Sequence, residues 1–141
     1  MPSFLYLDAY IWQLFLKQNN RMNIEITNHN GVPIAELIAD GIVINVVQDA
    51  LDLLGNAGYA GADKLILHAK NIIPDFFDLK TGIAGEILQK FSNYNMPLAI
   101  VGNYSQYTSK SLRDFIYESN KAGKVNFVSS VEEAIEKLAK K

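Results

Sequence analysis

Short apolar runs alternate with helix-patterned segments from Met22 to the end of the chain. Runs rich in β-branched residues have the length and composition of strands, and they occupy residues 24–27, 32–38, 65–68, 98–101 and 125–128. Apolar residues at helical spacing begin near residues 45, 83, 109 and 130. Strands separated by single helices are joined by right-handed crossovers. The pattern predicts one α/β domain over residues 22–141, with a mixed, mostly parallel sheet and about four helices.

The first two of these runs have no helix between them. The connecting residues Asn28-His29-Asn30-Gly31 have strong turn chemistry, so we expect an antiparallel hairpin. Pro33 has no backbone donor, so we expect its strand to lie near an edge of the sheet or Pro33 to be at the first residue of the strand. We expect the hairpin to form the mixed edge of the sheet. A further short apolar run at residues 42–44 is a candidate for one more strand. The expected order is β-β-(β)-α-β-α-β-α-β-α.

Capping residues indicate where the expected helices begin and end. Asn45 is a candidate N-cap for the first helix, since Gln48 follows at the spacing of a capping box. The glycine-rich residues 55–61 are expected to end that helix. Ser109 is a candidate cap for the third helix.

Composition narrows the classes of function. The formal net charge of -2 gives no general attraction to phosphate backbones, so nucleic acid is not an expected partner. The chain has no cysteine, which removes disulfides, thiolate nucleophiles and thiolate metal sites. A cysteine-free chain without a recognisable export signal suits the reducing cytoplasm, where we expect this protein.

The first 21 residues stand apart from the domain pattern. From Phe4 to Leu16 the sequence FLYLDAYIWQLFL is almost wholly apolar, yet shorter than the roughly 20 residues that span a bilayer, so stable membrane insertion is not expected. Lys17 and Arg21 follow this segment and no basic residue precedes it, unlike a signal peptide. Three interpretations remain: a helix docked on the domain, an anchor for a partner or membrane surface, or a start-site artefact with Met22 as the initiator. We favour the last, because the domain pattern begins directly after Met22.

A long stretch of the chain resembles a known family. The residues from Phe76 to Asn120 read FFDLKTGIAGEILQKFSNYNMPLAIVGNYSQYTSKSLRDFIYESN. This stretch resembles an uncharacterised bacterial family, the domain of unknown function DUF4180, and the resemblance extends essentially from Met22 to the C-terminus. It implies no particular activity.

The order of elements is also similar, more distantly, to that of STAS domains, typified by anti-sigma-factor antagonists. That resemblance implies a STAS-like fold and a switch in which a kinase phosphorylates an Asp-Ser-Ser/Thr-Gly-like turn that partner proteins read. Asp78 and the Thr81-Gly82 pair stand in the corresponding place here. Leu79 and Lys80 depart from the pattern, so Thr81 is the one candidate phosphoacceptor in the turn.

Two loops that follow strands carry most of the candidate functional residues. In open α/β sheets, ligands and partners bind at the carboxyl ends of the strands. Asp78 or Thr81 is a candidate N-cap of the second helix, and one of the two adjacent phenylalanines is expected to be exposed at an interface. The predicted contact surface consists of Asp75, Phe76, Phe77, Asp78, Lys80, Thr81, Tyr104, Tyr107, Lys110 and Arg113.

No sequence motif indicates catalysis. His29 and His68 are far apart and lack metal-ligand spacing, and neither a P-loop nor a dinucleotide-binding motif is present, so we expect no metal and no cofactor. The leading hypothesis is a non-catalytic regulatory or protein-interaction module with an unidentified protein partner. The alternative is a small-molecule-binding domain or modest enzyme with a pocket between the 74–82 and 103–111 loops. Homodimerisation, with the aromatic N-terminal segment lying across a second subunit, is a third possibility.

Overall fold

A five-stranded mixed sheet organises the molecule, whose computed structural model describes residues 22–140. The elements in chain order are β1 (Asn23–His29), β2 (Val32–Ile38), α2 (Val47–Tyr59), β3 (Lys64–His68), the 3-10 turns η1 (Ala69–Asn71), η2 (Pro74–Phe77) and η3 (Leu79–Thr81), α3 (Ile83–Asn93), β4 (Leu98–Val101), α4 (Lys110–Ala122), β5 (Val125–Val128) and α5 (Val131–Leu138). The strands lie in the order β1-β2-β3-β4-β5. β1 is antiparallel to β2, and every other neighbouring pair is parallel. The predicted α/β class and mixed, mostly parallel sheet are confirmed.

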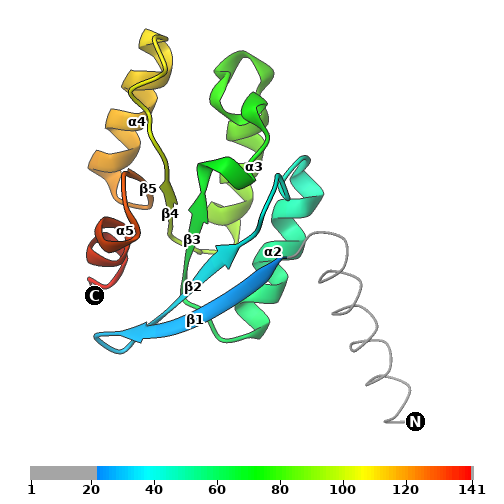
Figure 1. Ribbon diagram of the computed structural model, residues 1–141, viewed down its shortest axis with the longest axis vertical. Coiled ribbons are helices and arrows are strands. Elements are labelled where there is room, and N and C mark those ends of the chain that lie inside the picture. Colours follow the sequence, from blue (N-terminus) through cyan, green and yellow to red (C-terminus); the bar gives the residue numbers. More distant parts are fainter. Residues whose placement is uncertain (1–21, 141) are drawn as a thin grey trace.

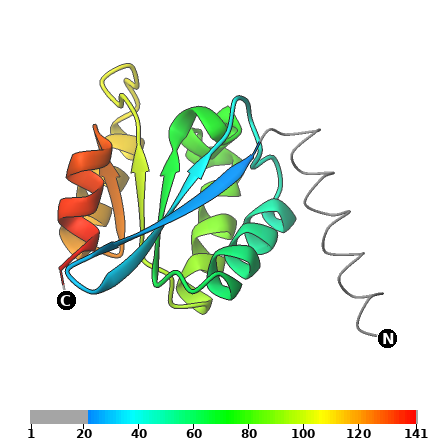
Figure 2. The same ribbon diagram turned by 60° about the horizontal axis from the view of Figure 1, so that its bottom comes forward.

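Helices cover the two faces of the sheet unequally (Figures 1 and 2). Residues of β3 alternate between the faces: Leu65 and Leu67 belong to the larger core cluster, and Ile66 belongs to the smaller one. The larger cluster packs α2, α3 and α4 against the sheet. Figure 2 shows α5, in red, on the opposite face, where Leu138 packs against the smaller cluster. The continuous apolar runs in the sequence reflect burial on both faces.

The predicted hairpin is present and has a two-residue turn. Asn30 and Gly31 have φ values of 56° and 80°, the positive values that a type I′ turn requires. Asparagine and glycine tolerate this conformation better than other residues. The turn brings Asn28 opposite Pro33.

Two details of the segment between β2 and β3 differ from the sequence prediction. Residues 42–44 do not form a strand, and only Ile44 makes a single bridge, to Ile72. The backbone nitrogens of Val43 and Ile44 donate instead to the Asn71 carbonyl, at 2.9 and 3.1 Å. The glycine-rich residues 55–61 do contain the end of the first helix, but they do not simply follow it, because α2 continues through them to Tyr59. Buried apolar residues on the sheet side of α2 favour continuation despite the glycines.

The predicted cap of α4 is confirmed, and the predicted cap of α2 is wrong by one residue. Ser109 accepts a hydrogen bond from the Leu112 nitrogen at 3.3 Å. In α2 the N-cap is Val46, and the Asp49 Oδ2 accepts from the backbone nitrogens of Asn45 and Val46, at 2.8 and 3.1 Å. The carboxylate of Asp49 therefore satisfies the free donors at the start of this helix.

We expect Asp49→Ala to lower the free energy of unfolding by about 1 kcal/mol, because two backbone donors lose their acceptor. Gln48→Ala is the matched control, since the Gln48 amide donates only to the exposed Asp52 carboxylate. Its expected cost is about 0.2–0.5 kcal/mol. Urea unfolding of both variants measures the difference, and an equal loss in the two would contradict the assignment of Asp49.

Residues 1–21, including the apolar segment from Phe4 to Leu16, lie outside the described residues, so the three interpretations of that segment stay predictions. Within residues 22–140, no helix is both long and apolar enough to cross a membrane.

Candidate functional site

The carboxyl ends of β3 and β4 lie side by side in the parallel sheet, where His68 is in register with Val101. The chain therefore enters the 69–82 and 102–109 segments at adjacent points on the same edge. A crevice runs between these segments. The two loops that the sequence singled out are neighbours in space.

The crevice has two hollows that share an aromatic wall. The first hollow has a volume of about 430 Å³ and lies over the ends of β3 and β4, between Lys70 and Asn103. The second, of about 340 Å³, extends toward Asp78 and the start of α4. Both hollows are lined by Phe77 and Tyr107. The crevice therefore combines an aromatic surface with polar groups at its margins.

A chain of aromatic contacts holds the two loops together. The ring of Phe77 stacks on that of Tyr107, with centroids 5.3 Å apart and planes inclined by 20°. Phe76 meets Phe77 edge to face at 4.9 Å. Tyr104 contacts Phe77 at 6.0 Å and Phe127 of β5 at 5.5 Å. These contacts connect the 74–77 turn to the 104–107 loop and to the core of the sheet.

The floor of the crevice is tightly packed at Gly102. A Cβ at this position would lie 2.8 Å from the Ala69 Cβ and 3.2 Å from the Tyr104 hydroxyl oxygen. Only glycine fits this approach without a shift of its neighbours. The Tyr104 hydroxyl is directed inward and donates to the Ile100 carbonyl. Burial raises the pKa of Tyr104 well above its usual range, and the neighbouring Tyr107 raises it further.

The raised pKa of Tyr104 predicts a loss of stability in alkali. The folded protein holds the phenolic proton more tightly than the unfolded chain, so this contribution is complete below the unfolded pKa of about 10 and falls as the pH rises above it. We expect the free energy of unfolding of Tyr104→Phe to depend less on pH above about 10 than that of the wild type. Urea unfolding from pH 8 to 11 measures this. A steeper dependence in the variant would contradict it.

The structure divides the predicted surface residues into three groups. Phe77, Asp78 and Tyr107 line the crevice. Phe76 and Tyr104 are turned into the core, and the remaining residues line neither hollow: Asp75, Lys80, Thr81, Lys110 and Arg113. The expectation of one exposed phenylalanine is wrong, because Phe76 and Phe77 are 2% and 6% exposed. Tyr107, from a later loop, covers the ring of Phe77.

Asp78 and Thr81 shape the turn before α3, although neither is the N-cap of that helix. Asp78 caps η3 by accepting from the Lys80 nitrogen at 3.3 Å, and Gly82 is the N-cap of α3. The Thr81 hydroxyl lies 2.8 Å from the carbonyl oxygens of both Asp75 and Asp78 and donates to them. Phosphorylation would remove the proton that these bonds use. Thr81 as a phosphoacceptor stays a prediction.

Lys110 and Arg113 lie on the exposed side of α4. The Lys110 ammonium group forms an ion pair with Asp114 at 2.8 Å, and both side chains are well exposed. An exposed pair at this helical spacing contributes about 0.3–0.5 kcal/mol. Neither Lys110 nor Arg113 lines the crevice.

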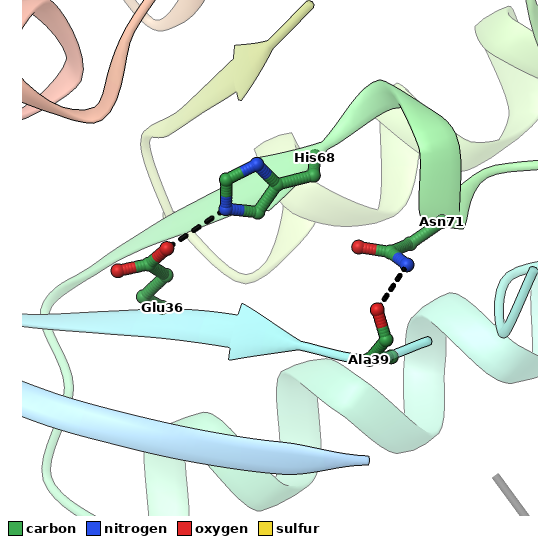
Figure 3. Close-up of polar contacts among 4 residues, drawn as sticks. All are labelled: Glu36, Ala39, His68 and Asn71. Carbon is green, nitrogen blue, oxygen red and sulfur yellow. Dashed lines mark hydrogen bonds and ion pairs between the residues drawn. The ribbon is translucent and has the colours of Figure 1, made fainter. Parts of the chain in front are cut away.

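Four polar residues that line the first hollow were not among the predicted site residues: His68, Lys70, Asn103 and Gln106. Figure 3 shows His68 at the end of β3 and its ring beside Glu36 of β2. The His68 Nε2 and Glu36 Oε2 atoms are 2.8 Å apart, and the two side chains are 21% and 25% exposed. Lys70 and Asn103 each lie two residues after the end of a strand, and this position in the sequence could have marked both as candidate site residues. Nothing in the sequence indicated that Glu36 pairs with His68.

Asn103 and Gln106, two of the polar residues that line the crevice, form hydrogen bonds within their own loop. The Asn103 carboxamide oxygen accepts from the nitrogen and hydroxyl of Ser105, at 3.1 and 2.7 Å. The Gln106 amide donates to the Asn103 carbonyl at 3.1 Å. No three His, Asp or Glu side chains are grouped as metal ligands anywhere in residues 22–140. The crevice is therefore a preformed cleft, and the hydrogen bonds of Asn103 and Gln106 hold part of its polar margin in place.

Comparison with known proteins identifies one family. A family model described as a domain of unknown function, DUF4180, matches residues 29–138. The match contains the whole crevice and strands β2 to β5, and it begins at the last residue of β1. No curated protein matches the chain.

Proposed function

The chain belongs to the DUF4180 family, and we propose that it is a non-catalytic regulatory module that acts by binding a protein partner at the crevice. The observation that carries this proposal is the pairing of an aromatic wall with a polar margin on two adjoining loops. Aromatic side chains beside polar groups are enriched at the centre of protein interfaces. We also propose that the protein acts in the cytoplasm.

The hydrogen-bond partners of His68 and Thr81 support a binding function in preference to catalysis. His68 is paired with Glu36, and the Thr81 hydroxyl donates to two backbone carbonyls. A catalytic hydroxyl needs a base within hydrogen-bond reach. Among residues 22–140 the partner of the His68 ring is the Glu36 carboxylate and the partners of the Thr81 hydroxyl are backbone groups, so His68 is not paired with a hydroxyl and Thr81 is not paired with a base. The order of elements resembles that of STAS domains, and this likeness to regulatory modules also supports the proposal.

Lys70 provides the sharpest test, because it is exposed and lines the crevice. The tagged full-length chain is used to capture proteins from its native cell. Lys70→Glu is compared with Lys121→Glu, an exposed charge reversal near the end of α4. We expect a stoichiometric protein to be recovered by the wild type and by Lys121→Glu. Recovery by Lys70→Glu is expected to fall at least about tenfold, which corresponds to about 1.4 kcal/mol. Recovery of no stoichiometric protein, or equal recovery by the two variants, would contradict the proposal.

A small organic anion is the second candidate ligand, and the charge of the first hollow favours it. Neither aspartate nor glutamate lines that hollow, whereas Lys70, Asn103 and Gln106 do. Its volume of about 430 Å³ lies within the range of small-molecule sites. An aromatic or apolar part of the ligand would lie against Phe77 and Tyr107.

Thermal shift measurements distinguish the two candidates. A set of nucleotides and aromatic carboxylates is screened against the wild type and Lys70→Ala. A ligand present at 100 times its dissociation constant stabilises the folded protein by about 2.7 kcal/mol. A shift that requires Lys70 supports the small-molecule function, and the absence of a shift with every anion removes it.

A further inference from the structure

Within residues 22–140, β1 is an edge strand with one unpaired side. In the described sheet it pairs with β2 and stands at the start of the strand order. Among residues 22–140, no other segment pairs with β1. Figure 1 shows it, in blue, at the margin of the sheet. An open edge of this kind is a template for a further strand.

The hairpin turn determines which backbone groups point outward. In a two-residue type I′ hairpin the residues that flank the turn form a hydrogen-bonded pair, here His29 and Val32. Hydrogen-bonded and non-hydrogen-bonded pairs then alternate along the strand. The outward-pointing N–H and C=O groups therefore belong to Asn28, Ile26 and Ile24. The position of Pro33 agrees with this alternation. Pro33 lies opposite Asn28 in a non-hydrogen-bonded pair, so pairing with β1 does not require a backbone N–H from Pro33.

We propose that β1 pairs with β1 of a second copy of the chain, antiparallel and about a twofold axis at Ile26. The two five-stranded sheets would form one continuous sheet. Ile26 lies opposite Ile26 of the second copy, and Ile24 lies opposite Asn28. The outward groups of both strands then form about six backbone hydrogen bonds.

The side chains of β1 are complementary in this register. Glu25 lies opposite the Thr27 hydroxyl of the second copy. The two diagonal neighbours of its carboxylate are His29 and Glu25 of that copy, so no second carboxylate lies directly opposite it. The Thr27 hydroxyl and His29 Nε2 are already 2.8 Å apart on the same strand. On the opposite face, Ile26 is 37% exposed and would contact its counterpart. Cross-strand pairs of these types stabilise antiparallel strand pairing.

The strand also lacks three of the features that prevent edge pairing, although it carries the charge of Glu25. The sequence NIEITNH has neither lysine nor proline, and its register with β2 has no bulge. A twofold axis at Ile24 or Asn28 would leave part of the strand unpaired. The axis at Ile26 uses the whole strand from Asn23 to His29.

Single-cysteine variants of the full chain test both the dimer and its register, because the natural sequence has no cysteine. In the proposed dimer the two Cα atoms at position 26 are about 5.5 Å apart, a distance that a disulfide spans. The Cα atoms at position 25 are about 8 Å apart, beyond that limit. We therefore expect Ile26→Cys to form a covalent dimer under mild oxidation and Glu25→Cys to resist it.

Tyr117→Cys, at a 66% exposed position on α4, reports random collisions. Since crosslinking within a dimer has an effective concentration near the millimolar range, Ile26→Cys should react at least about tenfold faster than Tyr117→Cys at micromolar protein. Equal rates at positions 26 and 117, or faster reaction at position 25, would overturn the register.

Light scattering gives an independent test. We expect the full-length wild type to have the mass of a dimer and Ile26→Lys to have the mass of a monomer, since an edge lysine opposes strand pairing. Circular dichroism confirms that the variant is folded. A monomeric wild type, including one whose residues 1–21 occupy the edge, overturns the proposal.

Discussion

Replacing Asn71 with aspartate is expected to lower the free energy of unfolding by about 3–5 kcal/mol, because the change places a charge where a donor is required. Asn71 is fully buried. Its amide donates to the carbonyl oxygens of Ala39 and Gly41, at 3.0 and 2.8 Å. Figure 3 shows the amide turned toward the Ala39 carbonyl. A carboxylate at this position would face two oxygens and could donate to neither.

The loss in Asn71→Asp should grow as the pH rises. Burial and the facing carbonyls favour the protonated form of the new carboxyl, so its pKa in the folded state lies above the unfolded value of about 3.9. The folded state then binds the proton more tightly, and stability falls as the pH rises above about 4. Urea unfolding at pH 4 and pH 7 measures this change.

Two further variants separate the causes. Asn93→Asp makes the same charge change at an exposed position at the end of α3, where the expected cost is about 0.3–1 kcal/mol. Asn71→Leu removes the donor without adding charge, and leaving the carbonyls unpaired should cost about 2 kcal/mol. This variant keeps the test usable if Asn71→Asp does not fold. An equal loss in Asn71→Asp and Asn93→Asp would show that the buried amide has no such role.

The role of Asn71 illustrates what the sequence could not predict. The run at residues 42–44 has the composition of a strand, but its backbone donors at Val43 and Ile44 are taken by the Asn71 carbonyl. The competing acceptor is nearly 30 residues away in the chain, and no local pattern indicates it. By contrast, the strands at residues 98–101 and 125–128 agree with the structure at both ends. Both runs are mostly apolar and buried, and the one buried polar side chain in them, Asn126, donates to the nearby Leu98 and Gly123 carbonyls.

The candidate site was predictable in place and only partly in composition. Parallel strands bring their carboxyl ends to one edge, so the meeting of the two loops follows from the order of elements. Which side chains face the crevice depends on packing. Tyr104 and Tyr107 are three residues apart in one polar loop, yet only Tyr104 directs its hydroxyl into the core, to the Ile100 carbonyl. The direction of each tyrosine hydroxyl depends on its distance from groups elsewhere in the fold, and the sequence pattern gives no information on those distances.

Phe77→Ala should have the other large effect, a loss of about 3–5 kcal/mol in the free energy of unfolding. Phe77 is 6% exposed, although it is in a short turn that the sequence places at the surface. Its ring contacts Phe76, Tyr104 and Tyr107, so truncation would leave a cavity between the two loops. Urea unfolding measures the loss. Tyr117→Ala, at a 66% exposed position, is the control and should change stability by less than about 0.5 kcal/mol.

A double-mutant cycle with Tyr107 shows whether the ring contact itself is responsible. We expect a coupling energy of about 0.5–1.5 kcal/mol between Phe77 and Tyr107, the range for aromatic pairs. Phe77→Leu, which keeps most of the volume, provides a folded reference for the cycle if the alanine variant does not fold. A coupling near zero would mean that each loop is held by the core alone. A coupling in the expected range would mean that the ring pair lining both hollows also fixes the separation of the loops, so that recognition at the crevice and stability of the fold depend on the same contact.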